Sequence, residues 1–354
     1  MRIVVMPGDD IGPEISAAAM LVLEQLNQSR QLGLAFETID VGMASFRQHG
    51  VTLTETGLAA ARNADGVILG PCGMTAYPPR DQGGINVPGT IRKDLQLFAN
   101  LRPARTRPGV PDARAGLDVL IVRENTEGFY ADRNMARGIA EFLATDDVAL
   151  SIRKITRQGS HRIARVAFEM ARKRRGKVTV VGKRHVLQIT DGLFVEETEK
   201  VAAEFPDVKL EEIDIDAAAA DLYSRPARYD VVLTTNMFGD ILSNQVVAMS
   251  GSLGLAAALN VGAKHAIANA GHGSAPDIAG KGVANPSGLL LSCAMLLDWF
   301  GARHGLPQLT YAANDLNEAI DRALSDPAVR TGDLGGSGTT KSFAEHIRDD
   351  LPKG

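Results

Sequence analysis

Residues 272–286 of the chain are HGSAPDIAGKGVANP, a segment that contains three glycines and two prolines. Glycine and proline are the strongest local signals for turns and loops. A short apolar run, His265–Ala268, precedes the segment, and a longer stretch with helical periodicity, Pro286–Phe300, follows it. The segment is therefore predicted to be a loop that joins a strand to a helix, with a tight turn at Gly271–Gly273.

The same succession of strand, loop and helix recurs along the chain. Short apolar runs predict strands at Ile3–Met6, Phe36–Val41, Gly66–Leu69, Asp118–Val122, Lys177–Val181, Val208–Ile213, Asp230–Thr234 and His265–Ala268. Helical periodicity predicts helices at Pro13–Leu26, Ser160–Arg174, Leu193–Glu204, Asp240–Met249, Pro286–Phe300 and Asn314–Ser325. This alternation indicates an α/β protein. With 354 residues the chain exceeds the size at which one hydrophobic core keeps growing, so two packed units are expected.

Composition excludes several classes of protein. The net charge of −4 gives no reason to expect a nucleic acid or an anionic membrane as partner. The two cysteines, Cys72 and Cys293, are far apart in the sequence, which excludes a disulfide scaffold and disfavours a zinc site. The sequence shows no signal segment and no apolar window long enough to cross a bilayer, so a cytoplasmic protein is expected. The one basic run, Arg172–Arg175, ends a predicted helix and is expected to be solvated there.

The first strand leads into the turn Gly8–Glu14, which has two glycines. By itself this is a tight turn between a strand and a helix. It lacks the G-x-G-x-x-G spacing of a dinucleotide fingerprint, and the chain has no Walker-type loop, no G-x-S-x-G and no metalloprotease His pair. Any nucleotide site must therefore be of another kind. The longest irregular stretch, Gly70–Thr90, is expected to be a functional or mobile loop.

Three arginines lie beside predicted structured segments: Arg92, Arg102 and Arg123. Guanidinium groups bind carboxylates through paired hydrogen bonds, so three of them around one cleft suit a di- or tricarboxylate. Each arginine taken alone is more often a surface or ion-pair residue.

Oxygen ligands for a metal are the next candidates. Asp240 is predicted to open a helix, and Asn244 follows four residues later on the same face. Together with Asp216 they suit Mg²⁺ or Mn²⁺, which take one or two carboxylates plus waters and substrate oxygens. The alternative role for Asp240 is a helix cap.

Taken together and in order, these motifs resemble the β-decarboxylating dehydrogenases, the family of isocitrate, 3-isopropylmalate, homoisocitrate and tartrate/D-malate dehydrogenases. The resemblance runs from the first strand to Asp333-Leu334-Gly335-Gly336, and residues 272–286 are its most specific part. The motifs that carry it are Gly8–Glu14, Arg92, Arg102, Arg123–Gly128, Tyr130, Lys183, Thr190–Phe194, Asp240 and His272–Pro286.

The resemblance implies a two-domain α/β fold that is not a Rossmann fold. One domain would combine residues 1–97 with 250–354, and the other would contain residues 98–249. An arm around Tyr130–Ile155 and the Asp240–Met249 helix would form a homodimer, or a larger assembly built from it, with sites shared between subunits.

The resemblance also implies roles for individual residues. Arg92, Arg102 and Arg123 would hold the substrate carboxylates, and Tyr130 would donate a proton late in the reaction. Lys183 would be the base that acts on the substrate hydroxyl. Lys183 and Asp216 would reach into the site of the neighbouring subunit. Mg²⁺ or Mn²⁺ would be bound by Asp216, Asp240 and Asn244.

The cofactor expected from the resemblance is NAD. Asp277 would accept hydrogen bonds from the adenosine ribose and repel a 2′-phosphate, and Ile278 supplies no positive charge, whereas NADP enzymes carry Lys and Tyr here. The cofactor-binding residues would be His272, Gly273, Ser274, Ala275, Asp277, Ile278 and Asn285.

Four positions depart from the family pattern: Asp10 in the first turn, His185 near the nicotinamide, Asn244 in the metal site and Asn269 before the His-Gly turn. His185 is favoured as a site residue over a packed core residue. The departures leave a second hypothesis open, a non-catalytic regulatory subunit of the same fold.

The substrate is expected to have a malate skeleton. The loop before Arg92, which contains the candidate substrate residues Asn86 and Thr90, matches neither the Ser and Asn of isocitrate enzymes nor the leucines of isopropylmalate enzymes. The predicted function is NAD- and metal-dependent oxidative decarboxylation of a small carboxylate, 3-isopropylmalate or an isocitrate-like acid, with tartrate and D-malate also open.

Overall fold

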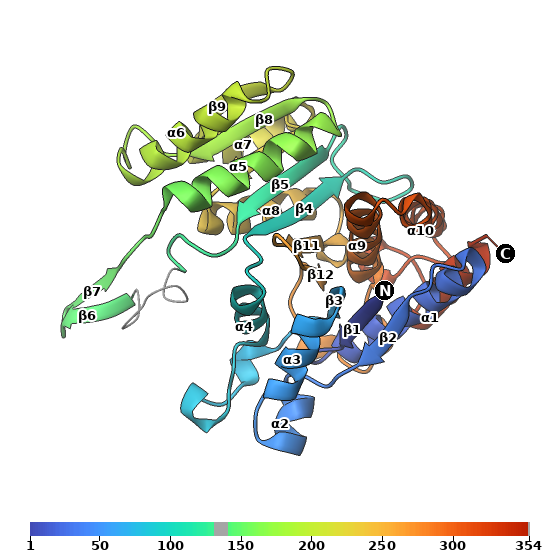
Figure 1. Cartoon of the computed structure of the whole chain (residues 1–354). Helices are drawn as coiled ribbons and strands as arrows, with labels where there is room; N and C mark the ends of the chain where they lie inside the picture. The colour runs from blue at the N-terminus through green and yellow to red at the C-terminus, as the bar shows by residue number, and fades with distance from the viewer. Residues whose placement is uncertain (131–140, 353–354) are drawn as a thin grey trace.

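The computed structural model describes residues 1–130 and 141–352 (Figure 1). Ten strands form one sheet in the order β2-β1-β3-β12-β11-β4-β5-β10-β8-β9. Their bounds are β1 Arg2–Met6, β2 Ala35–Thr38, β3 Gly66–Leu69, β4 Ala99–Arg105, β5 Asp118–Glu124, β8 Lys177–Gly182, β9 Lys209–Asp214, β10 Val231–Thr234, β11 Ala257–Val261 and β12 Ala266–Ala270. The mixed α/β class is confirmed.

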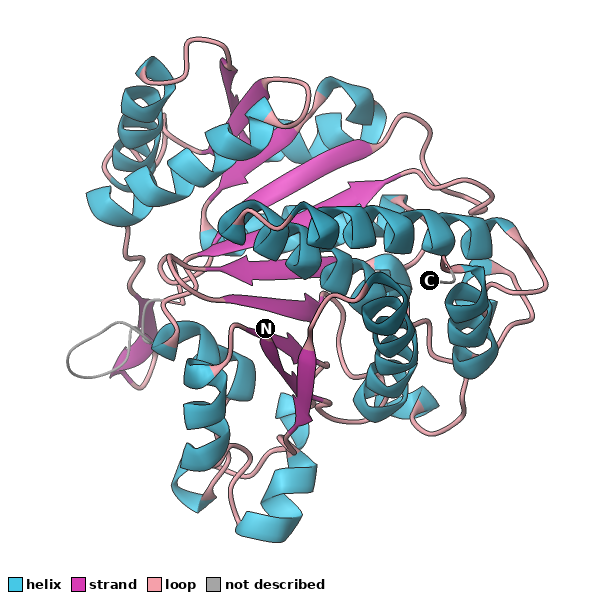
Figure 2. Cartoon of the chain, turned by 45° about the vertical axis from the view of Figure 1, so that its right-hand side comes forward, coloured by secondary structure: helices cyan, strands magenta, loops and turns pink. Residues whose placement is uncertain are grey.

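Helices cover both faces of this sheet (Figure 2). The α-helices are α1 Gly12–Arg30, α2 Met43–His49, α3 Glu55–Asn63, α4 Val87–Asp94, α5 Arg157–Arg172, α6 Thr190–Ala203, α7 Ile215–Ser224, α8 Asn236–Met249, α9 Ser287–His304, α10 Pro307–Ser325 and α11 Thr340–Asp350. Side chains of β5 alternate between two apolar clusters: Leu120 and Val122 pack with α5 and α9 residues, whereas Val119 and Ile121 pack with α7 and α8 residues. This period of two shows why β5 is apolar throughout, since both of its faces are buried.

The two halves of the sheet come from different parts of the sequence. Strands β2, β1, β3, β12 and β11 come from residues 1–97 and 250–354, and the other five come from residues 98–249. The antiparallel pair β11–β4 joins the halves through Leu259 opposite Leu101 and Asn260 opposite Asn100. The division into two domains stays a prediction, but its proposed limits coincide with the middle of the sheet.

Two central strands, β4 and β11, were not predicted. The β4 sequence ANLRPAR contains Asn, two Arg and Pro, which are uncommon in strands. Pro103 is tolerated because β11 pairs only with Ala99–Leu101, so the proline lies beyond that ladder, where its missing N–H removes no bond. The helices α2, α3, α4, α7 and α11 were also not predicted.

The prediction that Asp240 opens a helix is wrong. Helix α8 begins at Asn236, with Thr235 in an extended conformation as its N-cap residue, so Asp240 lies in the second turn. The solvated helix end predicted at Arg172–Arg175 is wrong in part. Helix α5 ends at Arg172, whereas Arg174 is ion-paired with Asp118 and Asp230.

A short two-stranded sheet projects from the molecule (Figure 1). It pairs β6 Glu141–Thr145 with β7 Val148–Ser151, within the arm predicted around Tyr130–Ile155; residues 131–140 of that arm lie outside the described part. Its apolar side chains Phe142, Leu143, Val148 and Leu150 are exposed. Within the described residues, no helix combines the length and the apolar character that a membrane span requires.

Candidate active site

Two adjacent strands place Arg102 and Arg123 side by side. In the antiparallel β4–β5 pair, Asn100 lies opposite Arg123, and Arg102 is two residues further along β4. Residues two apart on a strand share a face, so the two arginines are diagonal neighbours on one side of the sheet. Both are buried, with 8% and 4% of their surface exposed.

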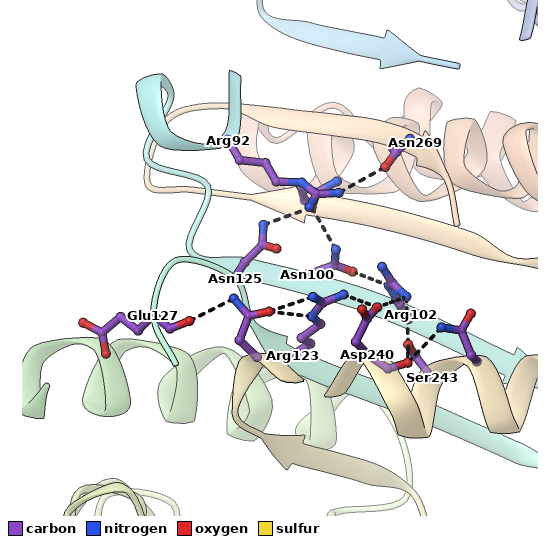
Figure 3. A network of polar contacts seen from close by, with 12 residues as sticks. Arg92, Asn100, Arg102, Arg123, Asn125, Glu127, Asp240, Ser243 and Asn269 are labelled. Carbon is purple, nitrogen blue, oxygen red and sulfur yellow. Dashed lines mark hydrogen bonds and ion pairs between the residues drawn. The ribbon is translucent and has the colours of Figure 1, made fainter. Parts of the chain in front are cut away.

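Helix α8 packs on this side and supplies the partners of both arginines (Figure 3). Nη1 of Arg123 donates to Oδ1 of Asp240 at 2.5 Å, and Nη1 of Arg102 donates to the same oxygen at 3.3 Å. Arg102 also donates to Oγ of Ser243 at 2.8 Å. The other nitrogens of Arg123 donate to Oδ1 of Asn236 at 3.1 and 2.6 Å. The helix thus fixes both guanidinium groups.

Arg92 approaches this pair from another element. It lies in the last turn of α4 and extends toward the same row of side chains (Figure 3). Its Nη2 donates to Oδ1 of Asn269 at 3.4 Å, and Asn269 is itself held by a 3.1 Å bond to the carbonyl of Leu69. The structure therefore brings all three predicted arginines to one region, and the departure at Asn269 contacts one of them.

Buried amides that sequence reasoning missed complete the network. Oδ1 of Asn260 accepts hydrogen bonds from Asn100 at 2.9 Å and from Asn125 at 3.1 Å, and Oδ1 of Asn100 accepts one from Nε of Arg102 at 3.0 Å. Asn100 and Asn260 follow the two-residue alternation of unpredicted strands, so only recognition of those strands would have revealed them. Amides satisfy the arginine donors without neutralising their charge.

Three guanidinium groups gather at this site (Figure 3). Burial, together with the charge of Arg123, lowers the pKa of Arg102 to about 10. That pKa still leaves the guanidinium protonated near neutral pH. Arg102 and Arg123 share the Asp240 carboxylate, and paired guanidinium groups of this kind favour the binding of a substrate carboxylate.

Lys183 lies in a different group of charges. Its Nζ donates to Asp216 and, at 3.3 Å, to Asp214, and the hydrogen bond with Asp216 raises the pKa of the lysine above its usual value. His185 also contacts Asp214, at 3.3 Å, and its exposed side chain rules out a packed core position.

The sheet order explains this separation. Arg123 is near the carboxyl end of β5, Lys183 follows the carboxyl end of β8, and β10 lies between these two parallel strands. The two residues therefore lie at the same end of the strands, but their backbones are about 10 Å apart across the sheet. Within one chain, Lys183 and Asp216 are therefore not in contact with Asp240. Tyr130 is half-buried at the border of the described residues.

The loop that bears Lys183 is fixed by a buried ion pair. Asp191, fully buried at the start of α6, accepts a 2.7 Å bond from the backbone N–H of Lys183 and pairs with Arg153. The Arg153 guanidinium also packs against the rings of Phe129 and Phe238. The Thr190–Phe194 motif thus positions the lysine loop through Asp191.

Segment 272–286 borders a pocket of about 400 Å³. The predicted cofactor residues that line it are His272, Gly273, Ala275, Ile278 and Asn285. Ser274 is buried and its carbonyl accepts a 3.1 Å bond from Ile11, which also lines the pocket. Asp277 is exposed and does not line it.

His272 has an unusual hydrogen-bonding state in this pocket. Its Nδ1 lies 2.9 Å from the carbonyl of Gly273, whereas its buried Nε2 has no partner among the described residues. Burial lowers the pKa of His272, so the ring is neutral near neutral pH. A buried, unsatisfied polar atom beside a pocket suits a ligand that carries a hydrogen-bonding ring.

Asp333 is a pocket residue to which sequence reasoning gave no role. It accepts hydrogen bonds from Nδ2 of Asn285, at 3.0 Å, and from Oγ of Ser252. It belongs to the Asp-Leu-Gly-Gly segment that marked the end of the family resemblance, which was the available signal. Asp333 orients Asn285 toward the pocket wall.

Glu14, at the end of the Gly8–Glu14 turn, is hydrogen bonded to the 272–286 loop. The carboxylate of Glu14 accepts bonds from the backbone N–H groups of Gly282 and Ala284, at 3.3 and 3.0 Å, and from Oγ1 of Thr340 at 2.8 Å. Asp10, the departure in this turn, has a positive φ of 53° and is exposed. Glu14 therefore ties α1, the glycine loop and α11 together.

Asn86 has a structural role in the chain as it stands. Its side chain caps α4 by accepting a 2.8 Å bond from the N–H of Gly89. Thr90 lies in the same helix, two residues before Arg92. Contact of Asn86 or Thr90 with substrate stays a prediction.

One chain offers few metal ligands in its described part. No group of three or more His, Cys, Asp or Glu side chains comes together there. Asp240 and Asn244 are one turn apart on α8, and Asn244 is exposed beside Ile241, which is 55% exposed. A carboxylate and an amide oxygen fit Mg²⁺, which binds through few protein ligands and completes its shell with water and substrate.

Comparison with known proteins shows which family this chain resembles. Residues 2–347 match the family model described as isocitrate/isopropylmalate dehydrogenase. The chain is 39% identical to a 3-isopropylmalate dehydrogenase of Archaeoglobus fulgidus, over 98% of each chain. It is 38% identical to an isocitrate/homoisocitrate dehydrogenase of Thermus thermophilus, over 99% of this chain and 98% of the relative.

Solved structures agree. The crystal structure of isocitrate dehydrogenase from Methylococcus capsulatus superimposes with a TM-score of 0.87 at 37% identity, and the match covers 99% of this chain and 98% of that one. The chain belongs to the isocitrate/isopropylmalate dehydrogenase family.

Proposed function

We propose that this protein is an oxidoreductase that uses NAD and Mg²⁺ or Mn²⁺ to oxidise and then decarboxylate a 2-hydroxy acid with a malate skeleton. The observation that carries the proposal is the convergence of Arg92, Arg102 and Arg123 on one region, where the Asp240 carboxylate bonds to two of the three guanidinium groups (Figure 3). The names of the relatives, which include isopropylmalate and isocitrate/homoisocitrate dehydrogenases, support the reaction class.

The arginines would hold the carboxylates and orient the carbon that bears the hydroxyl. Lys183 would take the proton of the hydroxyl group, and NAD⁺ held beside residues 272–286 would supply the acceptor for the hydride of that carbon, so that the acid becomes a 2-oxo acid. The bond to the β-carboxylate then breaks, CO₂ leaves, and its electron pair forms an enolate that Tyr130 protonates at carbon. The metal, held by Asp240 and Asn244 together with Asp216 from the second subunit, would supply Lewis-acid stabilisation of negative charge on the substrate oxygens.

The base needs a neutral amine, and this requirement supports a shared site. Within one chain, Asp216 and Asp214 hold the pKa of Lys183 high. In the proposed homodimer, Lys183 and Asp216 face the arginine-rich site of the second subunit, where positive charges disfavour the ammonium form. The exposed apolar side chains of β6, β7 and Ile241 support a subunit contact through the arm and α8.

The cofactor would occupy the pocket beside residues 272–286. Nε2 of His272, which has no partner in the described part of the chain, and the Asn285–Asp333 pair would offer hydrogen bonds to a purine. Asp277, exposed next to Ile278 at the rim, would disfavour a 2′-phosphate and so favour NAD over NADP.

The test is NADH formation with Mn²⁺ against isocitrate, 3-isopropylmalate, homoisocitrate, tartrate and D-malate, with NADP and EDTA as controls. The proposal expects one preferred acid, loss of activity with EDTA and weak activity with NADP. Silence across the panel from a folded dimer that still binds these acids would contradict it and favour a regulatory subunit of the same fold.

A further inference from the structure

A second pocket lies at the other end of the strands that carry the active-site arginines. Arg105, at the end of β4, lies opposite Asp118, at the start of β5. Asp118 is five residues before Arg123, a distance of about 17 Å along an extended strand. The pocket has a volume of about 190 Å³ and is lined by Arg105, Arg107 and Arg174 together with Asp118. It is therefore separate from the substrate region.

The pocket spans both halves of the sheet. Pro103 and Ala104 contribute from β4, and Leu291 and Met295 contribute from α9. Asn317 of α10 also lines it. A ligand bound here would contact residues from 98–249 and from 250–354 at once.

Positive charge exceeds negative charge around this pocket. Arg105 and Arg107 both bond to the carboxylate of Asp321 on α10. Arg174 and Arg175 both bond to Asp118, and Arg174 also donates to the buried Asp230 at 2.7 Å. Arg175, Asp230 and Asp321 do not line the pocket, so the excess of positive charge is that of its lining, in which three arginines face the one carboxylate of Asp118.

Arg107 is the most buried of the arginines that line this pocket. Only 10% of its side chain is exposed, and its Nη1 donates to Asp321. Its other N–H groups have no acceptor within residues 1–130 and 141–352. Burial lowers the pKa of Arg107 to about 10, which still leaves it charged near neutral pH. The unbonded nitrogens of Arg107 are not among the fully buried polar atoms that lack a partner, so water or a small ligand in the pocket can reach them.

We propose that this cavity, the Arg107 pocket, binds a small tetrahedral oxyanion of the phosphate or sulfate type. The guanidinium fork matches such an anion, and the volume is below the range of about 300–1,000 Å³ that is usual for nucleotide-sized or drug-sized ligands. The bound anion neutralises the excess charge and links β4 to α9 and α10. It thereby stabilises the junction between the two halves of the sheet.

The first test locates the anion without any substitution. Crystals of the whole protein, grown without sulfate or phosphate, are soaked in selenate, a sulfate analogue whose anomalous scattering marks its position. We expect a selenate peak beside Arg107, in addition to any peak at Arg102 and Arg123. A peak at the substrate arginines with none in the Arg107 pocket would overturn the inference.

The second test measures binding in solution. Calorimetric titration with inorganic phosphate at constant ionic strength is compared for wild type, Arg107→Met, Arg107→Lys and Arg303→Met. Arg303 is an exposed arginine near the end of α9, so its substitution makes the same charge change outside the pocket. We expect Arg107→Met to remove the pocket's binding or weaken it by at least about tenfold, and Arg107→Lys, which keeps the charge, to weaken it less.

Two outcomes contradict the proposal. One is unchanged phosphate binding in Arg107→Met. The other is a selenate peak at crystal concentration with no calorimetric binding attributable to the pocket, which would mean an adventitious ion only.

Discussion

The ammonium group of Lys183, directly after β8, and the carboxylate of Asp216, at the start of α7, are hydrogen bonded to each other within one chain, whereas Asp240 lies on α8. Both residues were expected in a site shared with a second subunit. Their pairing keeps them together and apart from the substrate arginines of their own chain. Mixing Lys183→Ala with Tyr130→Phe should therefore restore part of the activity, because half of the mixed sites would combine two intact halves.

The measurement is the specific activity before and after subunit exchange of the two inactive variants, with exchange verified by mass or fluorescence. The control is either variant exchanged with itself. No recovery after verified exchange would show that each site is complete within one chain.

Substitution of Arg123 by Met should reduce kcat/KM for the preferred acid by at least about thirtyfold. Losing one partner of a buried, hydrogen-bonded charge pair costs about 2 kcal/mol or more. The steady-state assay is run beside Arg303→Met, which alters the same charge at an exposed position. A decrease of similar size in both variants would assign the effect to net charge instead of to substrate contact.

Substitution of Asp277 separates two contributions to cofactor choice. Asp277→Asn keeps an acceptor oxygen but removes the charge, whereas Asp277→Ala removes both. Since opposed like charges cost several kcal/mol, both variants should lower the ratio of kcat/KM with NAD to that with NADP, by about tenfold or more. Asp277→Ala should in addition raise the KM for NAD. An unchanged ratio in both variants would place the discrimination elsewhere.

His272 should make the stability of the protein depend on pH in the acidic range. Its folded-state pKa is lowered by burial, so the unfolded chain, with a pKa of about 6.5, takes up this proton first. The contribution of His272 is thus complete above about pH 6.5 and is lost as the pH falls toward the folded-state pKa. Denaturant unfolding at pH 7.5 and pH 5.5 should show a smaller loss of free energy of unfolding in His272→Asn than in wild type. Equal losses would mean that the pKa of His272 is the same in the folded and the unfolded protein.

The sequence predicted the parts of the fold whose pattern is local. The buried parallel strands β1, β3, β8 and β10 are continuous apolar runs, and each was placed within one or two residues. Strand β4 was missed because its Asn, Arg and Pro are tolerated only through contacts made by neighbouring strands and α8. The start of α8 was misplaced because Asn236 has a role in binding Arg123 that spacing does not reveal.

In the active site, too, some residues could be predicted from the sequence and others could not. The three arginines and Asp240 could be named because of the family resemblance, and the structure brings them together. The buried amides Asn100 and Asn260 depend on strand pairing across long sequence separations, and periodicity in one segment contains no information about that pairing. The loop before Arg92 likewise gave no substrate identity, since its residues match none of the patterns of the known enzymes, and in the structure Asn86 caps α4.

The most direct test of the central claim is the ratio of CO₂ to NADH formed from the preferred acid. The acid is labelled with ¹³C at its β-carboxylate, and NADH absorbance and labelled CO₂ are followed in the same reaction with Mn²⁺. Oxidative decarboxylation predicts one labelled CO₂ for each NADH, with both products lost in EDTA. NADH formed without CO₂ would mean that the protein is a simple hydroxy-acid dehydrogenase, and would contradict the decarboxylation assigned to this site.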